Sequence, residues 1–167
     1  MPEFPRFGQG RVPSQVRALT DAGERVLTWA RDVDGEAVAA TYQAVYLPSA
    51  GGDHVRIPYE RIDTASWEHP VLSIVLAGPG ARRYLVQLEE PGELPPAIRE
   101  RVTATIALAE RVTLAGGAGA RITARRAPGH DELAWTVRFD EGVDPRDPQV
   151  RAQADAAIAA LRSSTGL

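Results

Sequence analysis

Between Gly23 and Leu88, apolar and polar residues alternate in short runs that are separated by turn-forming residues. An alternation with a period of two is typical of strands that bury one face. Asp34-Gly35 is a strong hairpin signal, because both residue types tolerate a positive φ. The pattern predicts about seven short strands, at the spacing expected of an antiparallel sandwich or barrel. The runs are residues 25–31, 36–41, 43–48, 55–59, 62–68, 71–77 and 83–88.

Within these runs, the alternation also predicts which side chains share a face. Val26, Thr28 and Ala30 fall on one side of the first run. Pro58 indicates an edge strand or a bulge, because proline cannot donate to a ladder. Further shared faces are predicted for Tyr42, Ala44 and Tyr46, for the core residues Leu72, Ile74 and Leu76, and for Tyr84, Val86 and Leu88.

The period changes to 3.6 after Pro95-Pro96, where Ile98, Val102, Ile106 and Ala109 recur at helical spacing. This stripe predicts one long helix that ends in the glycine-rich stretch at residues 116–119. We expect the ridge of Ile98, Val102 and Ile106 to cover the open end of the preceding sheet.

The remaining residues predict a strand–strand–helix unit, with strands at residues 121–126 and 133–139. Asp144-Pro145 and Asp147-Pro148 each offer an N-cap followed by proline at the first helical position. A unit of this size cannot bury its own apolar face, so we expect it to pack on the first part or on a second copy. Its apolar positions are Leu133, Trp135, Val137 and Phe139 on the strand, and Val150, Ala154, Ala157, Ile158 and Leu161 on the helix.

The chain begins with an aperiodic arm, residues 1–12, that contains Phe4 and Phe7. These aromatic residues either pin the arm onto the body or form a docking peptide for another protein. Pro13 is placed to open a short helix that reaches Leu19. The predicted organisation is therefore an arm with a short helix (1–22), a strand-rich domain with its capping helix (23–113), and a hairpin with a C-terminal helix (114–167).

Composition narrows the class of protein. The formal net charge is −3, with 19 basic residues, all arginine, against 22 acidic ones. A mildly acidic chain argues against nucleic acid or an anionic membrane as partner. The sequence has no cysteine, no recognisable signal peptide and no apolar run of membrane-spanning length, so we expect a cytoplasmic protein.

The order of seven strands and one helix resembles the bacterial form of the pleckstrin-homology (PH) superfold, over about half of the chain. The residues that carry the resemblance are Gly23 to Leu27, Thr41 to Leu47, Ile57 to Ile62, and Trp67. The resemblance implies an α+β, β-rich fold, a seven-stranded antiparallel barrel or sandwich capped by a helix, with the β-β-α unit as an addition.

Ligands differ among members of that superfold, so the fold alone assigns no function. Members that bind phosphoinositides place basic residues around the loop between the first two strands. Residues 31–36 hold three acids and one arginine here. We therefore do not expect phosphoinositide binding.

No motif in the sequence predicts catalysis, and we expect no catalytic residues, no metal and no cofactor. His54 follows Asp53 near Ser49, but no Gly-x-Ser-x-Gly elbow is present for a triad. His130 is followed by two acids within one tight turn, where consecutive residues rarely converge on one ion.

Two hypotheses follow, from different classes of function. The first is a non-catalytic binding or assembly module that contacts a protein partner through an exposed strand edge, the aromatic arm or the last helix. Self-association as a homodimer through the strand–strand–helix unit is one form of this hypothesis, and the candidate contact residues are Phe4, Phe7 and Trp135. The second is a binder of a small anionic or phosphorylated ligand. It would use Arg82, Arg83, Arg121, Arg125 and Arg126, of which Arg121 and Arg125 share a strand face with Thr123. The alternative for these arginines is a solvated outer face paired with acids.

Overall fold

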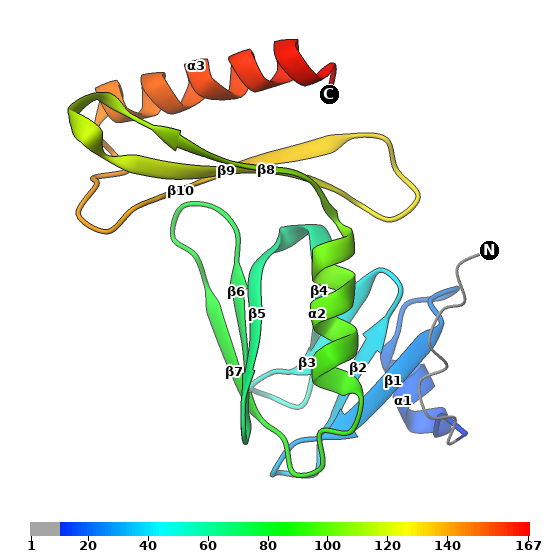
Figure 1. Cartoon of the computed structure of the whole chain (residues 1–167). Coiled ribbons are helices and arrows are strands. Elements are labelled where there is room, and N and C mark those ends of the chain that lie inside the picture. Colours follow the sequence, from blue (N-terminus) through cyan, green and yellow to red (C-terminus); the bar gives the residue numbers. More distant parts are fainter. Residues whose placement is uncertain (1–10) are drawn as a thin grey trace. The chain divides into compact units, whose positions relative to one another are not determined.

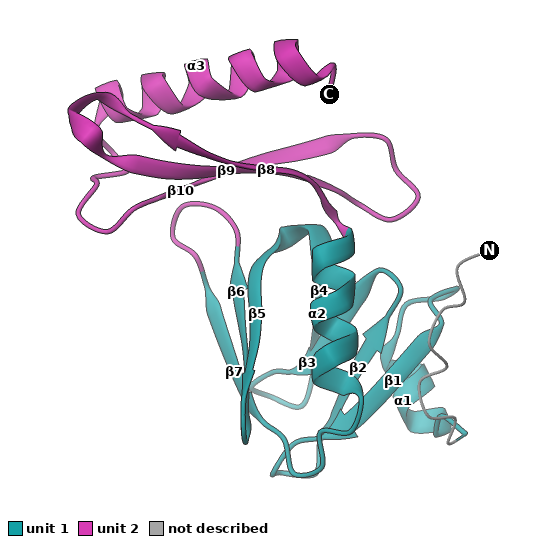
Figure 2. Cartoon of the chain, viewed as in Figure 1, with its two compact units in different colours: residues 1–76, 82–104 teal, residues 77–81, 105–167 magenta. Residues whose placement is uncertain are grey.

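The computed structural model describes residues 11–167. These residues form three antiparallel sheets and three α-helices (Figure 1). The chain separates into two compact units (Figure 2). Unit 1 comprises the described residues up to Leu76 together with Arg82–Ala104, and unit 2 comprises Ala77–Ala81 and Thr105–Leu167. Phe4 and Phe7 lie outside the described residues.

Unit 1 contains the seven strands that the alternation predicts, arranged in two sheets. Each sheet keeps sequence order, because every connection joins neighbouring antiparallel strands. Pro58 lies at the end of an edge strand, as expected. The four-stranded sheet consists of β1 (Val26–Arg31), β2 (Ala37–Thr41), β3 (Ala44–Pro48) and β4 (His54–Pro58), and the three-stranded sheet of β5 (Ile62–Glu68), β6 (Val71–Leu76) and β7 (Arg83–Gln87).

The two sheets of unit 1 meet at one corner and do not close into a barrel. At that corner the Val33 N–H donates to the Gln87 carbonyl at 3.0 Å, and the Glu89 N–H donates to the Arg31 carbonyl at 3.2 Å. Between β4 and β5, the chain instead passes through a 3₁₀ turn, Tyr59–Arg61. Since Pro58 has no N–H to donate and the turn leads away from β4, no ladder joins these two strands.

The helix α2 (Leu94–Ala104) contributes to the core of unit 1. Ile98 and Val102 are buried, at 0% and 6% exposure, in a cluster to which both sheets contribute. Leu72, Ile74, Val86 and Leu88 belong to the same cluster, with Leu76 and Tyr84 packed against it, so the predicted core rows are confirmed.

The prediction of a long helix through Ile106 and Ala109 is wrong. The helix ends at Ala104, and Ile106, which is 39% exposed, begins the strand β8 (Ile106–Thr113). The segment Ile-Ala-Leu-Ala-Glu-Arg-Val-Thr fits a helical and an alternating period equally well. Pairing with the following strand selects the extended form, because it satisfies the backbone groups of both strands.

The outer face of the four-stranded sheet is covered too. The short helix α1 (Ser14–Leu19) forms as predicted and buries Val16 at 2% exposure against Val26, Ala39 and Tyr46. A bulge between Val26 and Thr28 shifts the register, so Val26 faces this outer cluster whereas Ala30 faces the core. The predicted common face of Val26 and Ala30 is therefore wrong.

Unit 2 has three strands and one helix rather than the predicted two strands and one helix. Its sheet has the order β10-β9-β8, formed by β9 (Gly119–Arg126), β10 (Leu133–Phe139) and β8. The helix α3 (Pro148–Thr165) starts after Asp147, whose side chain accepts a hydrogen bond from the Gln149 N–H at 2.8 Å. Asp144 caps no helix and accepts instead from the Arg146 N–H in a turn.

Among residues 11–167, no helix is long and apolar enough to cross a membrane.

Candidate functional site

The sheet of unit 2 has two chemically different faces, which the strand register defines. Directly paired residues point to the same side of a sheet, and neighbours along a strand point to opposite sides. We call one side the helix face; it consists of Leu108, Glu110 and Val112 on β8, Ala120, Ile122 and Ala124 on β9, and Trp135, Val137 and Phe139 on β10. We call the other the arginine face; it includes Arg111, Arg121, Thr123, Arg125, Thr136 and Arg138.

Helix α3 lies on the helix face. The guanidinium carbon of Arg162 lies 5.2 Å from the centre of the Trp135 ring, which is a favourable cation–π arrangement. The Gln153 side chain accepts a hydrogen bond at 2.7 Å from the Ala115 N–H, in the turn between β8 and β9. These contacts attach α3 to β10 and to one end of the sheet.

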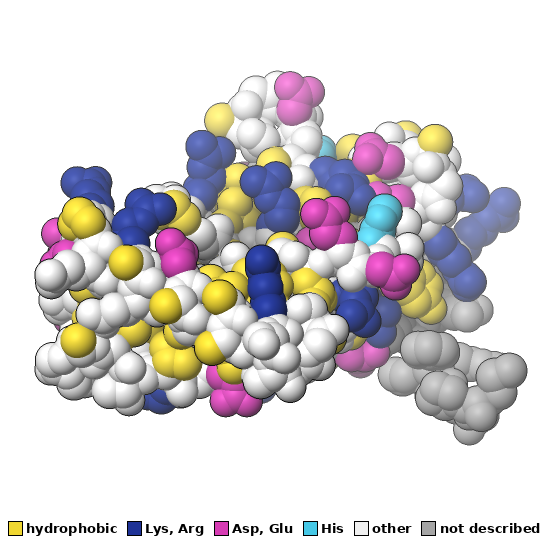
Figure 3. Space-filling model, turned by 90° about the horizontal axis from the view of Figure 1, so that it is seen from above, with side chains coloured by type: hydrophobic (Ala, Val, Ile, Leu, Met, Phe, Trp, Pro, Cys, Tyr) yellow, Lys and Arg dark blue, Asp and Glu magenta, His cyan; other side chains and the backbone are white. Residues whose placement is uncertain are grey.

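Coverage of the helix face by α3 is incomplete. Only the central strand is fully covered, since Ala120, Ile122 and Ala124 are all buried. Ala154 is the buried residue of α3. The other apolar positions of this layer remain partly exposed: Leu108, Val112, Trp135, Val137, Phe139, Val150, Ala157, Ile158 and Leu161. From the side of α3, Figure 3 shows hydrophobic side chains interspersed with arginines on this surface.

The arginine face carries a row of three arginines across the three strands. Arg121 on β9 is paired directly with Arg111 on β8 and with Arg138 on β10, and all three are exposed. Asp140, just beyond β10, forms an ion pair with Arg111. We call Arg111, Arg121 and Arg138 the arginine row.

The structure does not bring together the five arginines that the sequence suggested as a binding strip. Arg82 and Arg83 belong to unit 1, whereas Arg121, Arg125 and Arg126 belong to unit 2. Arg121, Thr123 and Arg125 do share a face, as predicted. However, Arg125 is only 3% exposed and donates from Nη1 to the Thr105 hydroxyl at 2.9 Å, and Arg126 points to the opposite side of the strand.

Trp135, proposed from the sequence as a partner contact, lies on the helix face and stacks with Arg162 of its own chain. The ring is partly exposed, so part of its surface remains available beside α3.

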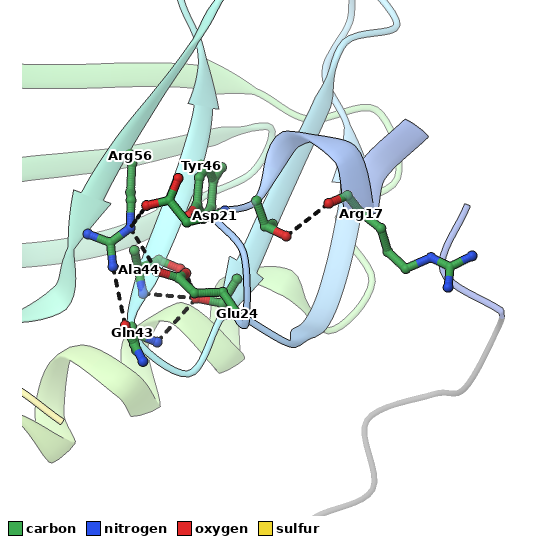
Figure 4. A network of polar contacts seen from close by, with 9 residues as sticks. Arg17, Asp21, Glu24, Gln43, Ala44, Tyr46 and Arg56 are labelled. Atoms are coloured by element: carbon green, nitrogen blue, oxygen red, sulfur yellow. Dashed lines mark hydrogen bonds and ion pairs between the residues drawn. The ribbon is translucent and has the colours of Figure 1, made fainter. Parts of the chain in front are cut away.

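A network of polar contacts in unit 1 connects several charged side chains (Figure 4). The Nε of Arg56, on β4, donates to Glu24 Oε1 at 2.8 Å and lies 3.2 Å from Asp21 Oδ2. The Thr41 hydroxyl donates to Glu24 Oε2 at 2.7 Å, and the Tyr46 hydroxyl accepts from the Asp21 N–H at 2.9 Å. The network therefore ties the loop after α1 to strands of the first sheet.

The electrostatics of this network indicate a structural role. Burial raises the pKa of Glu24, but the hydrogen bond from Thr41 and the guanidinium of Arg56 outweigh it and hold the pKa below its usual value. The Glu24 side chain is 5% exposed and its charge is compensated. A carboxylate stabilised in this way is a poor proton acceptor, so the network positions α1 rather than performing acid–base chemistry.

The three histidines lie apart in the chain, and two make contacts within unit 1. His54 Nε2 lies 2.8 Å from the Ala37 carbonyl oxygen, and the rings of His69 and Trp67 form a T-shaped pair with centroids 5.9 Å apart. Among residues 11–167, no three His, Asp or Glu side chains are grouped as metal ligands would be.

Comparisons with protein-family models, with curated proteins and with solved structures found no match for this chain.

Proposed function

We propose that this protein is a non-catalytic assembly module whose unit 2 associates with unit 2 of a second copy. The observation that carries the proposal is the incomplete cover of the helix face. A three-stranded sheet and a single helix are too small to bury each other's apolar faces completely. Trp135, Ile158 and Leu161 remain partly exposed at the margin of this layer. A second α3 packed against the same margin would bury them, in the self-complementary contact of a two-fold dimer.

The distribution of charge supports a second copy as the occupant. Unit 2 contains eight arginines and eight acidic residues, so it carries no formal net charge, and the remaining residues hold the whole charge of −3. Two copies of unit 2 therefore do not repel one another as two copies of unit 1 would.

For unit 1 we propose a PH-like fold. A four-stranded and a three-stranded antiparallel sheet, followed by one helix that enters the core between them, support this assignment. The loop between β1 and β2 argues against phosphoinositide as the ligand. Asp32 there is 8% exposed and accepts hydrogen bonds from the Asp34 and Glu36 N–H groups, so its carboxylate is built into the turn. Because the sequence lacks cysteine, the cytoplasm is our proposed location.

The experiment is sedimentation velocity of the full chain over a wide range of concentrations. We expect a dimer that dissociates on dilution, and a Leu161→Glu variant that stays monomeric, because a carboxylate would be buried at the margin of α3. Ala159→Glu, at an exposed position of the same helix, is the matched control and should remain dimeric.

Leu161→Ala provides a milder test in case the charged variant perturbs α3; it should weaken dimerisation without unfolding the unit. A wild-type chain that is monomeric throughout the range would overturn the proposal, as would a dimer that neither substitution at Leu161 weakens.

A further inference from the structure

The two edge strands of the unit 2 sheet differ in how far they are protected against pairing with another strand. An edge strand presents a row of backbone N–H and C=O groups, and proteins protect such edges with bulges, charges or short strands. The strand β8 has a bulge between Ile106 and Leu108 and carries Glu110 and Arg111. The strand β10 pairs with β9 over seven consecutive residues without a register shift, and Arg138 is its one charged residue. Of the two edges, β10 is therefore the more regular and the more apolar (Figure 1).

The register fixes which backbone groups of β10 point away from the sheet. Just beyond β10, the Asp140 N–H donates to the Gly119 carbonyl of β9 at 2.9 Å. Because the direction of these groups alternates along an antiparallel strand, the even-numbered residues of β10 bond to β9. The outward groups belong to the odd-numbered residues, whose side chains lie on the helix face: Leu133, Trp135, Val137 and Phe139.

We propose that β10 pairs antiparallel with β10 of a second copy, about a two-fold axis that passes beside Thr136. Pairing of this kind rests on the self-association of unit 2 proposed above, and names the strand and register that join the copies. We call the line where the two β10 strands meet the seam. The axis is perpendicular to the sheet, so both helix faces lie on the same side of one six-stranded sheet.

The register centred on Thr136 is self-complementary on the helix face. Trp135 then lies opposite Val137 of the second copy, and an aromatic side chain beside a β-branched one is a favourable cross-strand pair. Leu133 lies opposite Phe139 of the second copy in the same way. Since these four residues carry the outward backbone groups, every such group of β10 finds a partner across the seam.

The other face of the seam brings no like charges together. There Thr136 lies opposite its own symmetry mate, and Ala134 lies opposite Arg138 of the second copy. The strand β8 is less suited to the same pairing. An axis beside Glu110 or Arg111 would set like charges opposite each other, and a shift toward the start of β8 meets its bulge.

Pairing through β10 also accounts for the exposed margin of α3. The guanidinium of Arg162 lies over the Trp135 ring, so α3 runs beside the strand that forms the seam. Ile158 precedes Arg162 by one helical turn and therefore lies on the same side of the helix. The two-fold axis brings two copies of this margin toward each other, where partly exposed Ile158 and Leu161 can be buried.

The test is a disulfide cross-link in the full chain, which has no cysteine of its own. In the proposed register, Thr136 and its symmetry mate form a non-hydrogen-bonded pair, with Cα atoms about 4.5 Å apart. A disulfide spans that distance. Thr136→Cys should therefore form a covalent dimer under mild oxidation, followed by non-reducing electrophoresis.

The matched control is Ala134→Cys, at an exposed position on the same face of the same strand. In this register the two Ala134 residues lie four positions apart along the seam, about 14 Å, which a disulfide cannot span. We expect Thr136→Cys to cross-link at least tenfold faster than Ala134→Cys.

A second variant, Val137→Pro, removes one outward N–H without taking a hydrogen bond from β9. It should raise the dissociation constant of the dimer by about tenfold or more in sedimentation velocity. Val137→Thr keeps the N–H and the β-branched shape and should leave the dissociation constant within about threefold of wild type. Circular dichroism will verify that both variants are folded.

The outcomes separate this register from the self-association on which it rests. A wild-type dimer in which Thr136→Cys links no faster than Ala134→Cys would overturn the β10 pairing and leave the self-association of unit 2 in place. A chain that stays monomeric would overturn both. Fast linking at Thr136 together with a dimer that survives Leu161→Glu would support the β10 pairing and remove the α3 margin from the interface.

Discussion

The first sheet of unit 1 and the sheet of unit 2 are covered to different extents. In β2 and β3 nearly every residue is buried, because the inner face joins the core with α2 and the outer face is covered by α1. In unit 2 one helix lies on one face, and β8 contains no buried residue. The first sheet is therefore covered on both faces by its own chain, whereas the second leaves the whole of β8 without a buried residue.

The composition of the strands follows this difference. Strands buried on both faces are nearly continuous in apolar residues, as in Ala-Val-Ala-Ala of β2. In unit 2 polar and apolar residues alternate instead, as in Arg-Ile-Thr-Ala-Arg of β9, although only Arg121 of these five is exposed. One face of the unit 2 sheet therefore carries the arginines, and the other carries the apolar side chains.

The largest effect on stability is expected when two isoleucines, each on a helix that packs on a sheet, are compared. Ile98→Ala, at a position with 0% exposure, should lower the free energy of unfolding by about 2–5 kcal/mol. Ile158→Ala, which is partly exposed, should cost about 1 kcal/mol, because less apolar surface is lost. Denaturant unfolding of both variants measures the difference. Equal losses would mean that α3 is as well covered as α2.

A smaller loss of stability is expected from Glu24→Gln. This variant tests the polar network that ties the loop after α1 to the first sheet. Loss of the charged hydrogen bonds to Arg56 and Thr41 should cost about 1–2 kcal/mol at neutral pH, discounted because Arg56 is 30% exposed.

The same variant has a defined dependence on pH. The pKa of Glu24 is lower in the fold than its unfolded value of about 4.3. Its stabilisation is therefore fully present above that pH and is lost as the pH falls through the folded value. The difference in melting temperature between wild type and Glu24→Gln should shrink between pH 6 and pH 3. Asp53→Asn, at an exposed carboxylate, is the control, and a difference as large at pH 3 as at pH 6 would contradict the role of the ionised carboxylate.

The smallest effect is expected at Gly119, on the arginine face of unit 2. Gly119→Ala displaces the Arg111–Asp140 pair, but the atoms that must move are the ends of exposed side chains. The unfolding free energy should change by less than about 0.5 kcal/mol, because exposed ion pairs contribute little. Thermal melts at low and high salt should also show a weaker salt dependence than wild type. A loss of several kcal/mol would show that the side chains of Arg111 and Asp140 cannot move aside.

Much of unit 1 could be predicted from the sequence. The seven strands, the turn at Asp34-Gly35, the short helix after Pro13 and the core residues Ile98 and Val102 follow from periodicity and turn chemistry, which are local. The bulge after Val26 could not be predicted, because it depends on the pairing of β1 with β2.

The candidate site was less predictable than unit 1, mostly because of one wrong assignment. Assigning residues 106–113 to a helix hid the third strand of unit 2, and with it the place of Arg111 in the arginine row. Had β8 been recognised, its alternation alone would put Arg111 and Glu110 on opposite faces. The burial of Arg125 had no local signal, since a strand arginine is exposed in most sheets.

The sequence by itself determined where strands alternate, where turns occur, and that neither disulfides nor thiolate chemistry is present, because these depend on residue types and their near neighbours. Tertiary structure alone decided that residues 106–113 form a strand rather than a helix, and that the two sheets of unit 1 do not close into a barrel. It also decided that three arginines lie in a row. Each of these depends on which strand pairs with which and in what register, and pairing joins backbone groups that are distant in the chain.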